Sequence, residues 1–576
     1  MKFKTIILSI IVSITFFSCK KEVAPATNTL YYFDIVRPQF SGNLAYKTTA
    51  FVEQFWRVVG NKGFNESVYK IASELEKAGY VLESKANPED RLVYRIEKRP
   101  LENPTWEPVN ASLTLVDNDQ KILDFTTNRN MIYINSISTP EEGIIGDVVY
   151  IETPEEIEST DVKGKIVFAE MSPYKLYKKA IIDGGAIGLI TYNNPSYLQP
   201  EKNTTSIQFR GFPQREKINA WGIALSYEAK EKLKSSLVNG MTKVKVDITT
   251  NIYPSEELTV VANIKGSELP EESLVFSAHI QEPGANDNAT GVGTQLEMAA
   301  LSAELITNNQ LELKRTLTFL WGDEIVSTKR YVNEKEKRNP IIKWGISLDM
   351  VGENTDITGG SFLIEKMPDP SAIWTRGNDK HSEWGGKKLA LEDMKPHYLN
   401  DFIIEIFKAQ GDYANWEVNT NPFEGGSDHV PFLKADIPGL LLWHFTDQFY
   451  HTDNDRIDKV SQETMKNVGT AALVSAYTFL NANEETARHV LAVINFKAMK
   501  RLTDEVELSK AAIKKGAPIE EEIDIISAWS EWYLKALSSV EDMSSEPNEE
   551  LKSAIASKQS TIKRVTQNLI KDLQSL

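Results

Sequence analysis

The chain has 576 residues, which is too long for one hydrophobic core and predicts roughly three or four domains. Hydrophobic residues make up 41% of the chain and charged residues 25%, as in ordinary globular proteins, so wholesale disorder is excluded. The 81 acidic and 64 basic residues give a net charge of −17, which argues against nucleic acid or an anionic membrane surface as the main partner.

The N-terminus has the pattern of an export signal. Two lysines precede an apolar stretch, 6–17, that is short for a membrane-spanning helix. Cys19, the only cysteine, follows a small residue, and this arrangement resembles a bacterial lipobox. We therefore expect a lipoprotein signal peptide over 1–19, a lipid on Cys19 and a tether over 20–39. This predicts an outer-membrane lipoprotein of the bacterial cell envelope that faces the periplasm or the cell surface. The alternative is an ordinary signal peptide with an incidental cysteine.

The next segment, 40–131, is predicted to be the N-terminal part of the main domain. Apolar residues at helical spacing indicate two helices between residues 43 and 83. The stretch 91–116 alternates apolar and polar residues and contains prolines, which favours short strands.

The segment 132–253 has the pattern of a separate module. An apolar run at 166–168 is followed by a helical stretch, a glycine turn and a second apolar run at 187–190. This order of strand, helix, turn and strand resembles the protease-associated domain, which is commonly inserted into secreted peptidases. The module contains no histidine. We therefore expect a structural lid or a substrate-gating element without a catalytic role.

The remaining chain divides at about residue 483. In 254–483, strand-like and helical stretches alternate, as is typical of a three-layer α/β domain. The predicted strands are 258–264, 274–278, 317–321, 344–351 and 439–445, and the predicted helices include 293–305, 398–410 and 462–480. In 484–576, apolar residues recur at helical spacing among many charged residues. We expect two or three amphipathic helices there, which pack against the main domain or against a partner copy in a homodimer.

Histidine and carboxylate side chains gather at the predicted strand ends. The chain has only seven histidines, and three of them lie in loops with acidic neighbours. Because the carboxyl ends of parallel strands meet at one edge of a sheet, residues far apart in sequence can converge there. The residues in such places are His279, Asp287, Asp323, Glu324, Asp349 and His451.

These residue types suit a metal centre. Zinc prefers imidazole nitrogen and carboxylate oxygen. Two zinc ions, about 3.5–4 Å apart, share a bridging carboxylate and lower the pKa of bound water to about 7. A nearby free carboxylate must then take up the proton and pass it to the leaving amine. Five ligands and one base therefore predict a two-metal amidohydrolase.

The motifs, in this order, resemble the M28 family of metallopeptidases, which includes zinc aminopeptidases. The similarity covers roughly 258–480, with the protease-associated module where the family often carries an insertion. The resemblance implies that His279 and Asp349 bind one zinc ion. Asp287 would bridge this ion to a second one, which His451 would hold.

Supporting positions of the family also have counterparts. Asp428 and His429 belong to a Ser-Asp-His motif near the pocket, and Asp455 is placed to orient His451. The family usually has an aspartate two residues after the first histidine, and this chain has Gln281 there. The resemblance implies that the Gln281 carbonyl accepts the ring N–H without a charge.

The family's adjacent glutamate pair, a general base followed by a metal ligand, is altered. This chain has Asp323, Glu324 and Ile325 in that region. Either Asp323 is the base and Glu324 the ligand, which retains two zinc ions, or Glu324 is the base and Ile325 supplies no ligand, which allows about one. We favour the first alternative and therefore expect two zinc ions.

The resemblance implies a three-layer α/β zinc-exopeptidase-like fold with an inserted protease-associated domain and a C-terminal helical extension. The predicted function is that of an exported, lipid-anchored metallopeptidase that removes N-terminal residues from peptides. Two alternatives keep the same fold: a non-catalytic peptide-binding pseudoenzyme and a glutaminyl-cyclase-like acyltransferase. Zinc analysis together with aminoacyl-anilide hydrolysis separates the peptidase from the pseudoenzyme.

Overall fold

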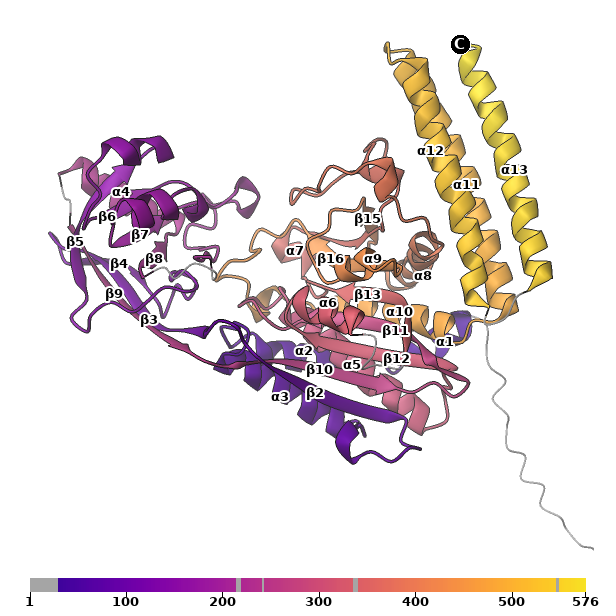
Figure 1. Ribbon diagram of the computed structural model, residues 1–576, viewed down its shortest axis with the longest axis horizontal. Helices are drawn as coiled ribbons and strands as arrows, with labels where there is room; N and C mark the ends of the chain where they lie inside the picture. The colour runs from indigo at the N-terminus through magenta and orange to yellow at the C-terminus, as the bar shows by residue number, and fades with distance from the viewer. Residues whose placement is uncertain (1–28, 214–218, 241–242, 335–339, 545–547) are drawn as a thin grey trace, which may run out of the picture.

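The structure is a computed structural model that describes residues 29–213, 219–240, 243–334, 340–544 and 548–576. The predicted signal peptide, Cys19 and the first part of the tether lie outside these residues. Within the described ranges, no helix combines the length and the apolar character that crossing a membrane requires. The chain forms an α/β domain flanked by a smaller β-rich module and by a C-terminal helical bundle (Figure 1).

A mixed sheet forms the centre of the α/β domain. Nine strands of the described chain belong to it, in the order β1-β2-β10-β12-β11-β13-β16-β14-β15. In that order they are Val81–Leu82, Leu92–Pro100, Glu256–Ile264, Arg315–Gly322, Leu269–His279, Ile341–Leu348, Gly439–Phe445, Ser361–Glu365 and Asn419–Asn421. The four strands β12, β11, β13 and β16 run parallel to one another. Their carboxyl ends therefore lie at the same edge of the sheet.

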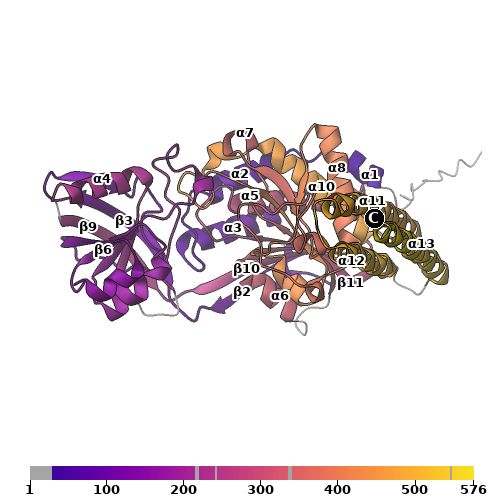
Figure 2. The ribbon, with the colours of Figure 1, turned by 90° about the horizontal axis from the view of Figure 1, so that it is seen from above.

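Helices cover both faces of this sheet. On one face lie Asn43–Val52 (α2), Lys62–Lys77 (α3), Ala289–Thr307 (α5), Leu399–Ala414 (α8) and Gln462–Leu480 (α10). The opposite face carries Val326–Asn333 (α6) and Val430–Lys434 (α9). Figure 2 shows α2 and α5 on one side of β10 and β2, and α6 on the other. The predicted three-layer α/β architecture is therefore confirmed.

Because helices cover both faces of the sheet, its central strands could be predicted from the sequence. All residues of β12 and β16 are buried. β16 is accordingly apolar except for His444, and β12 ends in the apolar run 319–321 after a part that includes Arg315, Thr316 and Thr318. The predicted strand 439–445 and helix 462–480 agree with β16 and α10 to the residue. The predicted strand 344–351 is too long, because β13 ends at Leu348 and its last apolar residues belong to a loop.

The predicted tether is shorter than expected. Residues Thr29–Val36 form a helix, α1, whose side chains Tyr32 and Phe33 are buried. The ring of Tyr32 contacts that of Tyr477 on α10, with ring centroids 5.8 Å apart. The apolar residues of this segment thus belong to the hydrophobic core.

The β-rich module has its own sheet. Among the described residues it contains seven strands, in the order β4-β3-β9-β5-β6-β7-β8. These are Gln120–Asp124, Thr105–Leu115, Lys243–Tyr253, Ile144–Ile151, Ile166–Ala169, Gly188–Thr191 and Trp221–Ala224, with one α-helix, Tyr227–Val238 (α4). The chain enters the module from β2 into β3 and leaves it from β9 into β10. In the main sheet β2 pairs antiparallel with β10, and in the module β3 pairs antiparallel with β9.

The module therefore begins earlier than the boundary predicted at residue 132. The pairing of β3 with β9 runs from Thr105 to Leu115. The sequence pattern of 91–116 predicted strands correctly, but it did not show that this stretch divides between two sheets.

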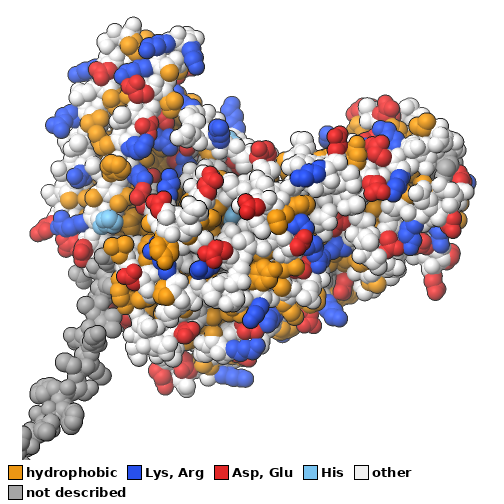
Figure 3. Space-filling model, turned by 180° about the vertical axis from the view of Figure 1, so that it is seen from behind, with side chains coloured by type: hydrophobic (Ala, Val, Ile, Leu, Met, Phe, Trp, Pro, Cys, Tyr) orange, Lys and Arg blue, Asp and Glu red, His pale blue; other side chains and the backbone are white. Residues whose placement is uncertain are grey.

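The C-terminal extension packs on the main domain of the same chain. Its described part has three long helices, Glu484–Ile513 (α11), Ile519–Ser538 (α12) and Glu549–Gln574 (α13). Arg376 forms ion pairs with Glu505 at 2.7 Å and with Glu522 at 2.6 Å, which connects a loop of the domain to α11 and α12. A homodimer stays a prediction. On the face seen in Figure 3, acidic and basic side chains are interspersed, and the surface is hollowed between the bundle and the module.

Candidate metal centre

The residues predicted to converge lie at the carboxyl edge of the parallel strands. His279 is the last residue of β11, Glu324 follows the end of β12, and Asp349 follows the end of β13. His451 lies in the loop after β16. A cavity of about 210 Å³ opens at this edge. It is lined by Glu282, Asp287, Glu324, Asp349, Met350, Trp384, Gly425, Gly426, Ser427, Trp443, Tyr450 and His451.

Asp287 lies between two histidines. Its Oδ1 atom is 3.3 Å from Nε2 of His279, and its Oδ2 atom is 2.9 Å from Nε2 of His451. The two oxygens of one carboxylate thus face two different imidazoles. A carboxylate that bridges two metal ions needs this arrangement.

One donor group consists of His279, Asp287 and Asp349, whose ligand atoms lie within 4.8 Å of one another. Oδ2 of Asp349 accepts a hydrogen bond from Ser427 Oγ at 2.8 Å. Its Oδ1 atom is buried, lies 3.9 Å from Nε2 of His279 and accepts no hydrogen bond from the described residues. Because a buried oxygen without a partner is costly, this atom fits a cation ligand.

A second donor group consists of Glu282, Asp287 and His451, whose ligand atoms also lie within 4.8 Å of one another. Oε2 of Glu282 is 3.2 Å from Nε2 of His451. The sequence interpretation missed Glu282. The only available signal was a second acidic residue in the loop after His279, since the direction of its side chain depends on the loop's backbone.

The cluster concentrates negative charge in a buried place. Burial disfavours the charged form of His279, but the carboxylates of Asp349 and Glu324 outweigh burial and hold its pKa well above the usual range. Burial likewise opposes the charge on His451, and Glu282 with Asp287 raises its pKa to about 10. Such a field attracts cations, as a site for divalent metal requires.

Glu324 and Asp323 differ in their access to the cavity. Glu324 lines the cavity, whereas Asp323 is not among the described residues that do. Burial raises the pKa of Glu324 well above its usual range. Burial and the charge of Asp428 raise the pKa of Asp323 to about 7. The ligand atom of Glu324 also lies within 4.8 Å of those of His279 and Glu282. Of the adjacent pair, Glu324 is therefore the carboxylate that faces the donor cluster, and Ile325 has no donor atom.

Gln281 does not contact the ring it was expected to orient. Its Oε1 atom accepts the backbone N–H of Glu324 at 2.9 Å. Asp428 lies nearer to that ring, with Oδ2 3.8 Å from Nδ1 of His279. Its other oxygen accepts the N–H of Ile325 at 2.7 Å, so the carboxylate is held in place. The neighbours of the Nδ1 atom of His279 are therefore Asp428 and Asn288, whose Nδ2 atom is 3.4 Å away.

Two other supporting residues have structural roles. Asp455 accepts the backbone N–H groups of Asn286 and Asp287, at 2.9 and 3.0 Å. Asp455 thus fixes the loop that carries Asp287. The sequence interpretation had instead expected Asp455 to orient His451. His429 has its Nε2 atom 2.9 Å from Oε1 of Glu365 and does not line the cavity.

The β-rich module contacts the loop that carries His451. The rings of Phe209 and His451 are 4.5 Å apart, and the N–H of Phe209 donates to the carbonyl of His451 at 3.0 Å. Asp453 accepts the N–H of Ile207 at 2.8 Å and donates its own N–H to the Ile207 carbonyl at 3.1 Å. The module therefore holds one of the histidines of the centre, although it contributes no histidine itself.

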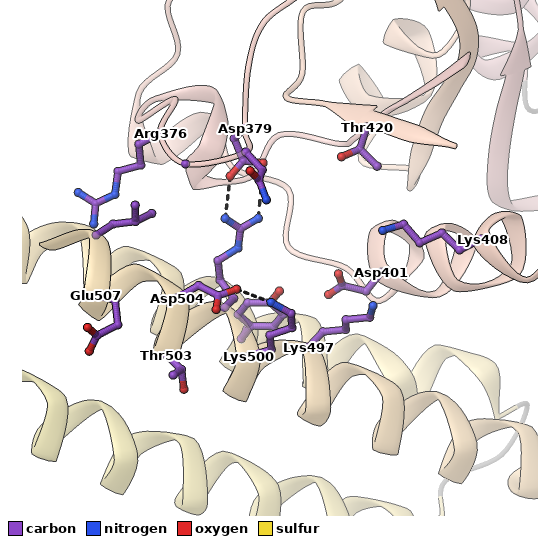
Figure 4. Close-up of a pocket in the computed structure, with 15 residues that line it drawn as sticks. Arg376, Asp379, Asp401, Lys408, Thr420, Lys497, Lys500, Thr503, Asp504 and Glu507 are labelled. Atoms are coloured by element: carbon purple, nitrogen blue, oxygen red, sulfur yellow. Dashed lines mark hydrogen bonds and ion pairs between the residues drawn. The ribbon is translucent and has the colours of Figure 1, made fainter. Parts of the chain in front are cut away.

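A larger cavity, about 680 Å³, lies between α8 and the helical bundle (Figure 4). Its charged side chains largely pair with one another or with near neighbours. Lys500 contacts Asp504 at 2.6 Å, and Arg501 contacts Asp379 at 2.7 Å. Its described lining has no histidine, so its chemistry does not match that of the smaller cavity.

The fold and the cluster together define a zinc-exopeptidase-like α/β domain. Residues 259–478 match the model of Peptidase family M28. Aminopeptidase YwaD of Bacillus subtilis is 24% identical over 336 residues, which cover 55% of this chain and 63% of that protein. Carboxypeptidase Q of Bos taurus is 25% identical over 473 residues, which cover 75% of this chain and 88% of that protein.

Comparison with solved structures also finds zinc aminopeptidases. BSAP, a zinc aminopeptidase from Bacillus subtilis, superposes with a TM-score of 0.52 at 18% identity, over 76% of this chain and 94% of that chain. The segment 259–478 is therefore similar in sequence to M28 peptidases, and the chain has a fold similar to that of this zinc aminopeptidase. The chain aligns with just under two thirds of the length of the Bacillus relative YwaD.

Proposed function

We propose that the chain is a metal-dependent aminopeptidase with a two-ion centre. The observation that carries the proposal is the placement of Asp287 between His279 and His451 inside one cavity. His279, Asp287 and Asp349 would hold one ion. Asp287 and His451 would supply two of the ligands of the second ion. When bound, such ions polarise the scissile carbonyl and lower the pKa of water to about 7.

Glu324 is the proposed general base. It faces the same cavity, and its backbone N–H is held by the Gln281 side chain. A carboxylate in this position can take a proton from the attacking water and deliver it to the leaving amine. This supports a catalytic protein over the non-catalytic pseudoenzyme, because the altered glutamate pair still leaves one carboxylate in the cavity.

The cavity supports cleavage at a chain terminus. Its volume of about 210 Å³ is below the roughly 300–1,000 Å³ of typical small-molecule pockets, so it suits one terminal residue. Trp384, Trp443 and Met350 line it, which favours an apolar side chain. No Arg or Lys is among the described lining residues. A free α-carboxylate would lack a cationic side chain there, which supports aminopeptidase over carboxypeptidase action.

The test is hydrolysis of aminoacyl p-nitroanilides by the purified protein. We expect turnover of leucyl and phenylalanyl substrates, loss of turnover with a chelator and recovery with zinc. N-acetylated substrates should not be cleaved. Bound zinc without turnover on a broad peptide panel would support the pseudoenzyme, and cyclisation of an N-terminal glutaminyl peptide without hydrolysis would support the acyltransferase.

We further propose that Cys19 carries a lipid that anchors the protein in the bacterial cell envelope, facing the periplasm or the cell surface. The support is the sequence pattern of two lysines, an apolar stretch and one cysteine. A Cys19→Ala variant should move from the membrane fraction to the soluble fraction and should lose incorporation of labelled fatty acid. A membrane-bound variant would contradict the proposal.

We also propose that the β-rich module is a protease-associated domain. Two observations support this proposal: the order of strand, helix, turn and strand in the sequence, and the parallel pairing of β5, β6, β7 and β8. Its proposed role is to position the loop that carries His451, through the contact with Phe209.

A further inference from the structure

The second metal position lacks a protein ligand at residue 325. The glutamate pair that would end with a ligand has Ile325 as its last residue, and an isoleucine side chain has no donor atom. Without it, Asp287 and His451 alone would bind the second ion. Catalytic zinc sites generally use three protein ligands and leave one position for water or substrate. A third donor is therefore needed from elsewhere in the chain.

Glu282 is in a suitable place. Its ligand oxygen lies within 4.8 Å of the ligand atoms of both Asp287 and His451. The Glu282 side chain is 17% exposed, and its Oε2 atom is buried. Oε2 accepts no hydrogen bond from the described residues, although Nε2 of His451 is 3.2 Å away. An acceptor that is buried without a hydrogen bond, beside two other donors, fits a cation ligand.

The backbone around Glu282 is clamped. The N–H of Glu282 donates to the carbonyl of Arg57 at 2.9 Å. The Arg57 side chain, 1% exposed, donates to the carbonyls of Ile280 at 2.7 Å and Gly284 at 2.8 Å, on both sides of Glu282. One buried arginine thus fixes the loop at three points.

The local conformation is also unusual. Glu282 has a φ of 81°, a left-handed value that a residue with a side chain seldom adopts. Such a conformation disfavours the folded state and persists where the surroundings enforce it, often at functional sites. Here the clamp by Arg57 enforces it, and the consequence is a carboxylate that faces the cavity.

We propose that Glu282 is the third protein ligand of the second metal ion and replaces the donor that Ile325 cannot supply. This inference rests on the proposed two-metal peptidase. The ligand comes from the loop after β11 instead of the end of β12, so this single loop provides Glu282 and Asp287 to the same ion. The altered glutamate pair is then compatible with two metals and with Glu324 as a free base.

The test measures the zinc content and zinc affinity of the full chain after dialysis, by mass spectrometry and by competition with a chromophoric chelator. We expect about two zinc ions per wild-type chain and about one per Glu282→Gln chain. The affinity of the weaker site should fall by more than the roughly 10–100-fold that removal of an outer-shell partner causes. Glu324→Gln is the matched control, because it makes the same change in the same cavity and should retain two ions.

Several outcomes would overturn the inference. It fails if Glu282→Gln keeps both ions, if Glu324→Gln loses one while Glu282→Gln does not, or if the wild-type chain binds only one. A Glu282→Gln variant that raises KM with unchanged zinc content would make Glu282 a substrate anchor instead. Thermal unfolding of the metal-free variants shows whether each is folded.

The failure of the proposed function is distinguishable from these outcomes. Two zinc ions in the wild type, one in Glu282→Gln and no peptide hydrolysis by either would leave Glu282 as a ligand and refute the peptidase.

Discussion

Replacing Glu324 by glutamine removes the proposed base and retains the shape of the side chain. The backbone N–H of Glu324 donates to Gln281 at 2.9 Å, and this contact does not depend on the carboxylate. The local structure should therefore survive. A general base contributes about 10²–10⁴-fold to the rate, so we expect kcat to fall by that factor. This corresponds to about 3–5 kcal/mol of lost transition-state stabilisation.

The assay is steady-state hydrolysis of leucyl p-nitroanilide, with zinc content measured on the same sample. Zinc content should stay at the wild-type value, because Glu324 is not assigned as a ligand. Asp323→Asn is the control for position, since Asp323 is adjacent in sequence but does not line the cavity. It should lose at most a few-fold in kcat. The reasoning is refuted if Asp323→Asn loses as much activity as Glu324→Gln, or if Glu324→Gln retains more than about a tenth of the wild-type rate.

Three further predictions follow, two on the surroundings of the centre and one on Asp401 in the larger cavity. Gln281→Leu removes the acceptor of the Glu324 N–H, so kcat should fall about tenfold at unchanged zinc content; loss of zinc would instead indicate a role on the metal side. Phe209→Ala removes the ring that contacts His451, so zinc affinity at the weaker site should fall roughly tenfold in the chelator competition, while an unchanged affinity would show that the module does not position the loop. Burial raises the pKa of Asp401, on α8, to about 6. The folded state therefore holds the proton more tightly than the unfolded state, and the contribution of this group to stability decreases as pH rises from about 4 to about 6. The stability of Asp401→Asn relative to wild type should consequently rise by about 1 kcal/mol between about pH 5 and about pH 8, and calorimetry that shows the opposite trend would contradict this.

Much of the main domain could be predicted because its strands are covered on both faces. Burial on both faces produces apolar runs such as 319–321 in β12 and 440–443 in β16, and these runs can be recognised without knowledge of the neighbouring strands. Two residues that follow such runs, Glu324 and Asp349, therefore could be assigned to one edge of the sheet. The same patterns did not show that β3 belongs to a second sheet, since alternation reveals a strand but not its neighbour.

The supporting contacts of the centre could not be predicted, because they join loops that are distant in sequence. Asp428 approaches His279 from a loop about 150 residues further along, and Asp455 holds the loop of Asp287. The sequence placed Gln281 and Asp455 on the nearest histidines, since family position was the only guide. In the folded chain each of them binds a backbone N–H instead.

The amino-acid sequence by itself determined which donor groups are available and which strand ends carry them. Local hydrophobic pattern decides where a strand stops, so His279 and Asp349 were identifiable from their neighbours. Only the tertiary structure decided which oxygen faces which histidine. That choice depends on how Arg57 clamps the loop of Glu282 and on how a separate module packs against the loop of His451. Both are long-range contacts, and no local property of the chain specifies them.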